Sequence, residues 1–224
     1  MPRPVRSVSA LVLVFAGFLA ACSDQAEEPA RVVGSFVPVD DGASDPGFVA
    51  FRDSLRAVVA RRDTAALVAA VGPGARLSFG DDAGGPEGLC AMWFTGRPPG
   101  GVPLWDVLDR LLSAGSVLED GAVTVPYAFG AWPDSVDAFS HVAVVGEDVP
   151  ATTAPSDTAR VVALVTHSIL PVSGPAADGY QQVRLPGGAE AYVPAAAAMS
   201  PVGYRATFWD EGDGWKLHFL VAGD

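Results

Sequence analysis

Residues 144–194 read VVGEDVPATTAPSDTARVVALVTHSILPVSGPAADGYQQVRLPGGAEAYVP. Within this stretch, short apolar runs with a period of two are separated by Gly, Pro, Asp and Ser, which are typical of tight turns. The same pattern begins at residue 121 and continues toward the C-terminus in the runs GAVTVPY, HVAVVGE, ARVVALV, YQQVRL, EAYV, YRATFW and WKLHFLV. It predicts a series of short β-strands over the second half of the chain.

Before this stretch, the folded part of the chain is predicted to begin with a helix. Asp45 followed by Pro46 is typical of a helix start, because aspartate caps free backbone N–H groups and proline lacks only a donor that would be unpaired there. Apolar residues then recur at helical spacing from Phe48 to Val58. Asp63 is in position to cap a second helix, which we expect to end at Gly72-Pro73-Gly74.

Three further segments precede the strand pattern. The run ARLSFG, residues 75–80, alternates like a short strand, and the Gly/Pro-rich region 80–101, which holds Cys90 and Trp93, is predicted to be irregular. A third helix is predicted from Pro103 to Ser113, where leucines form one apolar face. Early helices followed by strands predict an α+β fold in which the helices pack on an antiparallel sheet.

The C-terminal run YRATFWDEGDGWKLHFLVAGD is predicted to be a hairpin with its turn near Asp213-Gly214. The early helices have little sheet of their own to pack on. We therefore expect the hairpin to return to them and to the strand in GAVTVPYAFGAW. The predicted division is an α+β domain of residues 46–140 plus 200–224, with a separate module over residues 141–199.

Residues 144–194 resemble the bacterial SH3-like domain, a small five-stranded barrel found in many cell-envelope proteins. Family members carry a "V.VR..PS..A.VI" entry, a hydrophobic strand, a variable loop and a "W.kV...dG..GWV" ending. The corresponding segments here are residues 149–156, 160–164, 180–183 and 187–193. The resemblance implies a small SH3-like β-barrel in the second half of the chain.

The segment departs from the family pattern at three places. Thr152 replaces the usual arginine, Tyr180 replaces a tryptophan, and Ala191-Tyr192 replaces the Gly-Trp of the ending. Family barrels are described as binding cell-wall peptide or glycan, and others serve as spacers, so both roles stay open. If the module binds a ligand, the resemblance makes Tyr180 and Tyr192 the candidate binding aromatics.

Residues 1–22 read MPRPVRSVSALVLVFAGFLAAC, a basic start, a short apolar run and small residues before a cysteine. The apolar run is too short to span a membrane comfortably, which predicts a secretion signal. Leu19-Ala20-Ala21-Cys22 resembles the lipobox of bacterial lipoproteins. The resemblance implies a signal peptide over residues 1–21, cleavage between Ala21 and Cys22, and acylation of Cys22, for example by palmitate. At about 0.8 kcal/mol per buried methylene, several acyl chains would anchor the protein stably in a bilayer.

Residues 22–45 are polar, acidic and poor in aromatics, which predicts a flexible tether. Ser23 in place of an aspartate is compatible with delivery to the outer membrane, so the expected location is the periplasmic face of that membrane. Lys and Arg number 14 against 26 Asp and Glu, for a net charge of −12. A chain this acidic repels nucleic acid, which we exclude as a partner.

The sequence contains no G-x-S-x-G, H-E-x-x-H, phosphate-loop or C-x-x-C motif. Apolar neighbours predict that Cys90 is a buried, inert residue. The alternative is an envelope hydrolase of peptidase or amidase type using Cys90 with His141 or His167, because envelope peptidases with such barrels use a Cys/His pair. A disulfide between Cys22 and Cys90 would compete with lipidation of Cys22.

His141, His167 and His218 lack ligand spacing and are expected to be partly exposed residues of strands. Asp81-Asp82 and the acidic run at residues 210–213 could suggest calcium, but neither has the ligand spacing of a known loop, and turns explain both. The tryptophans could form a sugar-stacking platform, but core packing is the expected use of most of them. We therefore expect no metal, no cofactor and no catalytic residue. The leading hypothesis is a lipid-anchored, non-catalytic envelope protein whose SH3-like domain binds the cell wall or another envelope protein.

Overall fold

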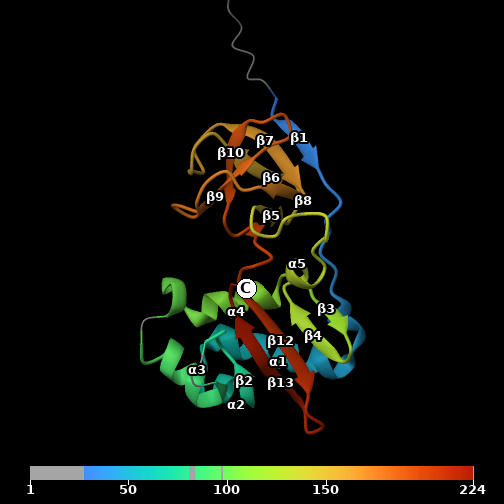
Figure 1. Cartoon of the computed structure of the whole chain (residues 1–224), viewed down its shortest axis with the longest axis vertical. Helices are drawn as coiled ribbons and strands as arrows, with labels where there is room; N and C mark the ends of the chain where they lie inside the picture. Colours follow the sequence, from blue (N-terminus) through green and yellow to red (C-terminus); the bar gives the residue numbers. More distant parts are fainter. Residues whose placement is uncertain (1–27, 81–83, 97, 224) are drawn as a thin grey trace, which may run out of the picture.

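The computed structural model describes residues 28–80, 84–96 and 98–223, which form an α+β fold. Figure 1 shows two halves stacked along the long axis of the molecule. We call residues 40–130 and 200–223 the mixed half, because they contain the helices and one sheet. Residues 28–39 and 131–199 form the β half. Among the described residues, no helix has the length and apolar character needed to cross a membrane.

The mixed half packs helices on a sheet with strand order β2-β13-β12-β4-β3. Its helices are α1 (Pro46–Arg61), α2 (Thr64–Ala69), α3 (Gly85–Trp93), α4 (Leu104–Leu112) and α5 (Tyr127–Gly130), with 3-10 turns η1 (Asp41–Ser44) and η2 (Pro99–Gly101). Its strands are β2 (Val71–Arg76), β3 (Val117–Glu119), β4 (Ala122–Val125), β12 (Arg205–Asp210) and β13 (Trp215–Val221). One aromatic and aliphatic core joins both layers.

Helices α1 and α2 begin after the capping residues that the sequence predicts. The carboxylate of Asp45 accepts the N–H of Phe48 at 2.8 Å, and that of Asp63 accepts the N–H of Ala66 at 3.1 Å. Both predicted helix caps are therefore confirmed. The expected return of the C-terminal hairpin is also confirmed, because β12 pairs antiparallel with both β13 and β4. The sheet is mixed rather than purely antiparallel, since β2 runs parallel to β13.

Two predictions around residues 70–95 are wrong. Helix α2 already ends at Ala69 and is not terminated by Gly72-Pro73-Gly74. These three residues belong to strand β2. A Cβ at Gly72 would lie 2.8 Å from the Cε1 of His218, so glycine permits the close approach of β2 to β13. Region 80–101 is not wholly irregular, because α3 forms there and turns Leu89 and Trp93 into the core.

The β half contains two sheets, ordered β1-β7-β6-β10-β9 and β11-β5-β8. Its strands are β1 (Ala30–Val33), β5 (His141–Val144), β6 (Val149–Thr152), β7 (Val161–Thr166), β8 (Ser168–Pro171), β9 (Tyr180–Arg184), β10 (Glu190–Pro194) and β11 (Ala198–Met199). The sheets enclose one aliphatic core and are joined by a bridge between Val172 and Val183. The expected closed SH3-like barrel is not found here, because strand pairing among the described residues closes no barrel.

Part of the range expected to be a flexible tether is ordered. Ala30–Val33 forms β1, which runs parallel to β7 with Ala30 opposite Ala163. The prediction is wrong here because β7 offers an open edge to these residues, and Gly34 then passes close to His167, whose carbonyl oxygen would lie 2.4 Å from a Cβ at Gly34. The signal peptide and Cys22 lie outside the described residues.

The chain passes between the halves along residues 34–40, 131–140 and 200–204 (Figure 1). The ring of Phe36, in the first of these passages, lies 5.6 Å from Tyr127 and 5.8 Å from Trp132, measured between centroids. Ala128 and Met199 are buried in the same cluster. The junction between the halves is therefore packed by side chains as well as crossed by backbone.

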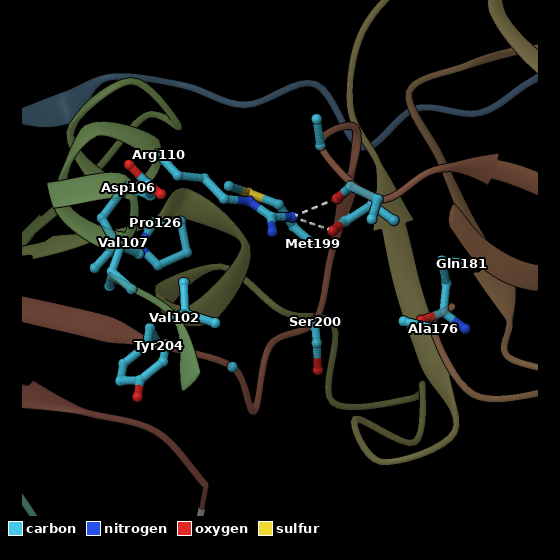
Figure 2. A pocket seen from close by; sticks show the side chains of 15 residues that line it. Val102, Asp106, Val107, Arg110, Pro126, Ala176, Gln181, Met199, Ser200 and Tyr204 are labelled. Atoms are coloured by element: carbon cyan, nitrogen blue, oxygen red, sulfur yellow. Dashed lines mark hydrogen bonds between the residues drawn. The ribbon is translucent and has the colours of Figure 1, made fainter. Parts of the chain in front are cut away.

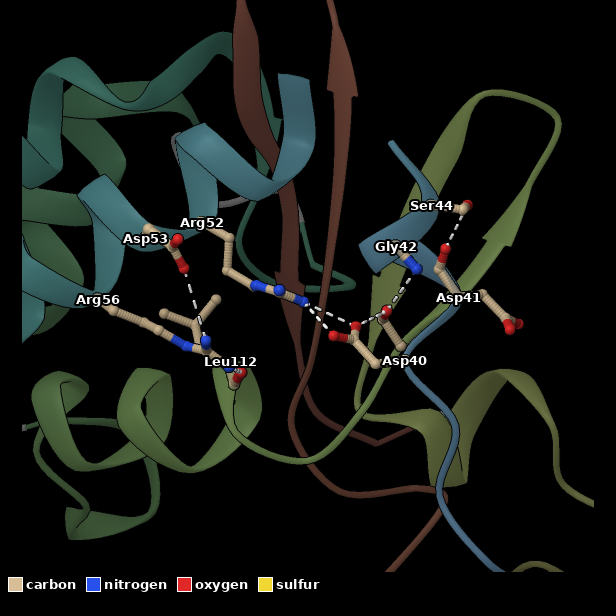
Figure 3. A network of polar contacts seen from close by, with 9 residues as sticks. Asp40, Asp41, Gly42, Ser44, Arg52, Asp53, Arg56 and Leu112 are labelled. Atoms are coloured by element: carbon tan, nitrogen blue, oxygen red, sulfur yellow. Dashed lines mark hydrogen bonds and ion pairs between the residues drawn. The ribbon is translucent and has the colours of Figure 1, made fainter. Parts of the chain in front are cut away.

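A polar network holds the first passage against the mixed half (Figure 3). Nη1 of the buried Arg52 donates to both carboxylate oxygens of Asp40 at 2.7 and 2.6 Å, and the Ser116 hydroxyl donates to Asp40 at 2.6 Å. Burial alone would raise the pKa of Asp40. The hydrogen bonds from Ser116 and Arg52, with the charges of Arg52 and Arg56, outweigh burial and lower that pKa.

Candidate functional site

A cavity of about 470 Å³ lies between the two halves. Figure 2 shows α4 residues and Tyr204 on one side of it, Ala176 and Gln181 on the other, and Met199 and Ser200 between them. We call it the junction cleft. Its remaining lining residues are Val102, Asp106, Val107, Arg110, Leu111, Pro126, Ala195, Ala196, Ala198 and Gly203. A mostly apolar cavity of this size with a few polar groups is typical of ligand-binding sites.

Arg110 is the principal charged group of the junction cleft. It comes from the last turn of α4, a helix that is fixed in the core by buried residues such as Leu104 and Leu108. Its Nη2 group donates to the carbonyl oxygen of Ala195 at 2.8 Å and to that of Ala198. Within the described residues, its Nη1 and Nε groups have no protein hydrogen-bond partner. Desolvation lowers the pKa of Arg110, but a guanidinium remains protonated at neutral pH.

Other polar groups are spread around the junction cleft. Asp106 lies one helical turn before Arg110, and the Tyr204 hydroxyl donates to the carbonyl of Pro99 at 3.1 Å. Burial raises the pKa of Tyr204, so this phenol stays protonated. Gln181 uses its amide nitrogen on the Gly174 carbonyl at 2.8 Å, which leaves its amide oxygen as an acceptor. The arrangement suits binding of a ligand that has both apolar and hydrogen-bonding parts.

Sequence reasoning missed Arg110 and Tyr204. An arginine in the last turn of a helix is explained by the helix dipole alone, so its position carries no signal of a binding site. The partners that give Arg110 its role are backbone carbonyls more than eighty residues later in the chain. Only the amphipathic pattern of α4, which orients Arg110 outward, was visible in the sequence.

Tyr180 and Tyr192 come together, but not in the junction cleft. Tyr180 pairs with Pro194 and Tyr192 with Gln182, so both tyrosines lie on one face of the β9–β10 pair. Gln181 lies on the opposite face, because successive residues of a strand alternate, and it is Gln181 that lines the junction cleft. Both tyrosines are partly buried.

Cys90 lies in α3 and is partly exposed, so the prediction of a buried cysteine is wrong. Leu89 and Trp93 occupy the buried face of the helix, and Cys90 lies beside that face. His141 begins β5 and His167 follows β7, both in the β half. Figure 1 shows α3 in the opposite half, so the structure does not bring Cys90 together with either histidine.

His141 and His167 are partly exposed as predicted, whereas His218 is only 5% exposed. The His218 ring stacks on Trp209 with centroids 3.4 Å apart, and its Nε2 lies 3.4 Å from a Glu211 oxygen. Burial lowers the pKa of His218, and the charge of Glu211 opposes this only in part. His218 is therefore a packed core residue of β13.

The acidic turn at residues 210–213 has the expected turn chemistry. Asp210 accepts the backbone N–H groups of Gly212 at 2.8 Å and Gly214 at 3.0 Å. Asp81-Asp82 lies outside the described residues. Within the described ranges, no three His, Cys, Asp or Glu side chains are grouped so that they could hold a metal ion.

The tryptophans pack mainly on the cores, as expected. Trp93 is buried, and Trp105 and Trp215 cover the core of the mixed half. Trp132 belongs to the junction cluster and donates its indole N–H to the Val136 carbonyl at 2.9 Å. These tryptophans therefore form no shared platform around the junction cleft.

Comparison of the chain with protein family models, with curated proteins and with solved structures finds no match in any of the three.

Proposed function

We propose that this chain is a lipid-anchored, non-catalytic envelope protein that binds the cell wall or another envelope protein. The ligand would enter the junction cleft, at the border of the SH3-like module. The observation that carries this proposal is Arg110, a cation with unpaired N–H donors in a mostly apolar cavity of about 470 Å³. A charged donor that meets apolar surface in a cavity is suited to binding and orienting a ligand.

The order of strands supports an SH3-like character for residues 141–199. Strands β6 and β7 pair antiparallel, as do β9 and β10, and β10 also pairs with β6. These strands share one core with Val142 of β5 and Leu170 of β8. Small antiparallel sheets wrapped on a common core are the architecture that the family resemblance implies.

Anchoring rests on the lipobox-like residues Leu19-Ala20-Ala21-Cys22. Metabolic labelling with a fatty-acid analogue should label the wild-type protein and fail to label Cys22→Ala. Labelling that persists in Cys22→Ala would refute this part of the proposal without affecting the junction cleft.

Binding is tested by sedimentation of the purified full-length chain with insoluble peptidoglycan. The wild type should sediment with the wall at low salt, whereas Ala196→Trp should stay in the supernatant. Ala196 is exposed and lines the junction cleft, so tryptophan at this position fills the cavity. The matched control is Ala60→Trp on the exposed face of α1, which should sediment like the wild type.

Two results would argue against wall binding in the junction cleft. A wild-type protein that remains wholly in the supernatant removes the wall as a ligand and leaves another envelope protein, detected by crosslinking in cells. If Ala196→Trp sediments like the wild type, binding occurs elsewhere, and the outer face carrying Tyr180 and Tyr192 is the next surface to change.

A further inference from the structure

The sheet of the mixed half packs against helices on one face only. Its residues Val123, Phe208 and Leu217 belong to the core that the helices complete. Neighbouring residues of a strand alternate between the two faces, and cross-strand partners share a face. The opposite face therefore includes Glu119 on β3, Ala122 and Thr124 on β4, Thr207 and Trp209 on β12, Phe219 on β13 and Arg76 on β2. We call these residues the uncovered face.

No element of the described residues lies over the uncovered face. In Figure 1 the helices of the mixed half lie behind β12 and β13, and no helix or strand is drawn in front of these two strands. The residues in the middle of the face, such as Thr207 and Trp209, are accordingly partly exposed. Arg76 and Glu119, at its two edges, are exposed.

Aromatic rings give the middle of the uncovered face its apolar character. The ring of Trp209 lies 5.8 Å from that of Phe219, measured between centroids, and stacks on the ring of His218 at 3.4 Å. The hydroxyls of Thr124 and Thr207 are hydrogen-bonded to each other at 3.1 Å, so covering them costs less than covering two unpaired hydroxyls. Partly exposed aromatic residues of this kind often anchor protein–protein contacts.

Two exposed phenyl rings extend the uncovered face at the end where β12 begins. Phe79 is 52% exposed and Phe129 is 38% exposed. The guanidinium carbon of Arg205 lies 5.2 Å from the centroid of the Phe79 ring and 4.4 Å from that of the Phe129 ring. These cation–π contacts fix both rings in place, which lowers the entropic cost of a contact with another molecule.

The charges at the two edges make the uncovered face complementary to itself. Strand β12 is the middle strand of the order β2-β13-β12-β4-β3. When two such faces meet about a two-fold axis parallel to β12, the β3 edge of one copy lies opposite the β2 edge of the other. Glu119 lies at the β3 edge and Arg76 at the β2 edge, and neither forms an ion pair within the described ranges.

We propose that two copies of this chain associate through their uncovered faces, with the two-fold axis along β12. Trp209 and Phe219 then pack on the same residues of the second copy, and Glu119 of each copy approaches Arg76 of the other. Along the strands, Glu119 is level with Trp209 and Arg76 with Phe219, a separation of about two residues or ~7 Å that these long side chains span. The contact leaves the junction cleft free, so it is independent of the proposed function.

The size of the uncovered face predicts a weak contact. With strands ~4.8 Å apart and ~3.3 Å per residue, five strands of up to 7 residues cover roughly 400 Å². Two such faces with their flanking phenyl rings approach the roughly 1,000 Å² of the smallest specific interfaces. We therefore expect a reversible dimer with a Kd of roughly 10–100 µM.

The test is sedimentation equilibrium of the purified full-length chain in a density-matched detergent solution, over a range of protein concentrations. The salt concentration is 0.15 M, where a screening length of ~8 Å weakens the long-range repulsion between chains of net charge −12. The protein mass should rise from that of one chain to that of two, with the Kd given above. A chain that stays monomeric up to about 0.5 mM overturns the proposal.

Charge reversal at the edges tests the two-fold arrangement. Arg76→Glu and Glu119→Arg each place like charges opposite each other twice in a dimer, and each should weaken association roughly tenfold. The double variant Arg76→Glu/Glu119→Arg restores opposite charges in both pairs, so its Kd should return to within about threefold of the wild-type value. The control Arg61→Glu changes an exposed arginine at the end of α1 and should behave like the wild type.

A double variant that associates as weakly as the single variants overturns the two-fold arrangement. So does a control Arg61→Glu that weakens association as much as Arg76→Glu, because it would show that only the total charge matters. Circular dichroism of each variant verifies that the fold is retained.

Crosslinking assigns the contact to the uncovered face. Thr207 lies on the proposed axis, and packed sheets are ~10 Å apart, so cysteines at this position in two copies are within reach of a short bismaleimide. In a Cys90→Ala background, Thr207→Cys should give a crosslinked dimer in high yield. The matched control Ser54→Cys, on the exposed side of α1, should give little, and both variants keep Cys22. Equal yields from Thr207→Cys and Ser54→Cys overturn the assignment to this face.

Discussion

The core of the mixed half contains the aromatic residues Phe48, Trp93 and Phe208 among its Leu and Val residues, whereas the buried residues of the β-half core are Val, Ala and Leu. Phe48 is completely buried, and its ring centroid lies 5.8 Å from Phe208 and 5.1 Å from Trp215. In the β half, Val165 is equally buried but belongs to a cluster of Val, Ala and Leu residues. The same degree of burial therefore removes much more apolar area per residue in the mixed half.

The two halves therefore depend on different interactions for their stability. Single side chains should matter most in the mixed half, while the β half distributes its stability over many small contacts and backbone pairs. The tryptophans provide a probe for the comparison, because all of them lie within residues 93–132 or 209–215. Tryptophan fluorescence therefore reports on the mixed half and the junction, and far-UV circular dichroism reports on both halves.

The largest effect is expected for Phe48→Ala. Truncation of this buried aromatic should lower the free energy of unfolding by about 3–5 kcal/mol, measured by urea unfolding followed by tryptophan fluorescence. The control Phe139→Ala removes a ring that is 68% exposed and should change little. If fluorescence and circular dichroism shift together, the halves unfold as one unit; a loss below about 1 kcal/mol contradicts the importance of this ring.

Val165→Ala should cost about 2 kcal/mol, from two buried carbons and a small cavity. The shift should be visible by circular dichroism in urea. Val33→Ala on β1, where the side chain is 73% exposed, is the matched control and should have no large effect. A cost as large as that of Phe48→Ala would break the proposed contrast between the two cores.

Asp40→Asn should cost roughly 1–2 kcal/mol at neutral pH, because the buried Arg52 loses its counter-charge while Asp40 is itself partly exposed. The control is Asp41→Asn, an exposed neighbour in η1. Thermal or urea unfolding measures both variants.

The difference in unfolding free energy between the wild type and Asp40→Asn should depend on pH. The pKa of Asp40 is lower in the folded protein than in the unfolded chain. Its contribution is therefore fully present above the unfolded pKa of about 3.9 and is lost as pH falls through the lower folded pKa. The gap between wild type and Asp40→Asn should accordingly close in acid. A gap independent of pH would show that hydrogen-bond geometry rather than charge is responsible.

The smallest effect is expected for Arg31→Gln. Arg31 and Asp148 form an ion pair at 2.8 Å between β1 and the turn before β6, but their side chains are 67% and 57% exposed. Such pairs contribute less than about 1 kcal/mol. A cost above that value, measured by circular dichroism in urea, would mean that β1 contributes more to the β half than its edge position suggests.

The parts of the fold that could be predicted are those set by neighbouring residues. Asp45 and Asp63 cap helices through N–H groups three residues away, and the turn after β12 is closed by Asp210. The parts that could not be predicted depend on distant partners. Gly72 lies in a strand because its missing side chain leaves room for the distant His218, and β1 pairs with an edge of β7 that lies some 130 residues later.

The candidate site could not be predicted for the same reason, because it also depends on residues that are far apart in the sequence. The two tyrosines indicated by the family resemblance share a face of the sheet, but the cavity forms where α4 meets the turn after β10. Neither element contains a motif for binding. The site depends on how the halves are packed, which no local pattern in either half expresses.

Strand β1 also limits how far the β half could lie from a membrane if Cys22 were acylated as proposed. Only seven residues, 23–29, separate Cys22 from Ala30, the first residue of β1, so the two residues are eight Cα–Cα steps apart. A fully extended chain of this length reaches about 29 Å, compared with about 80 Å had the whole range 22–45 been unpaired. With acylation at Cys22, the start of β1 would be held within about 29 Å of the lipid surface.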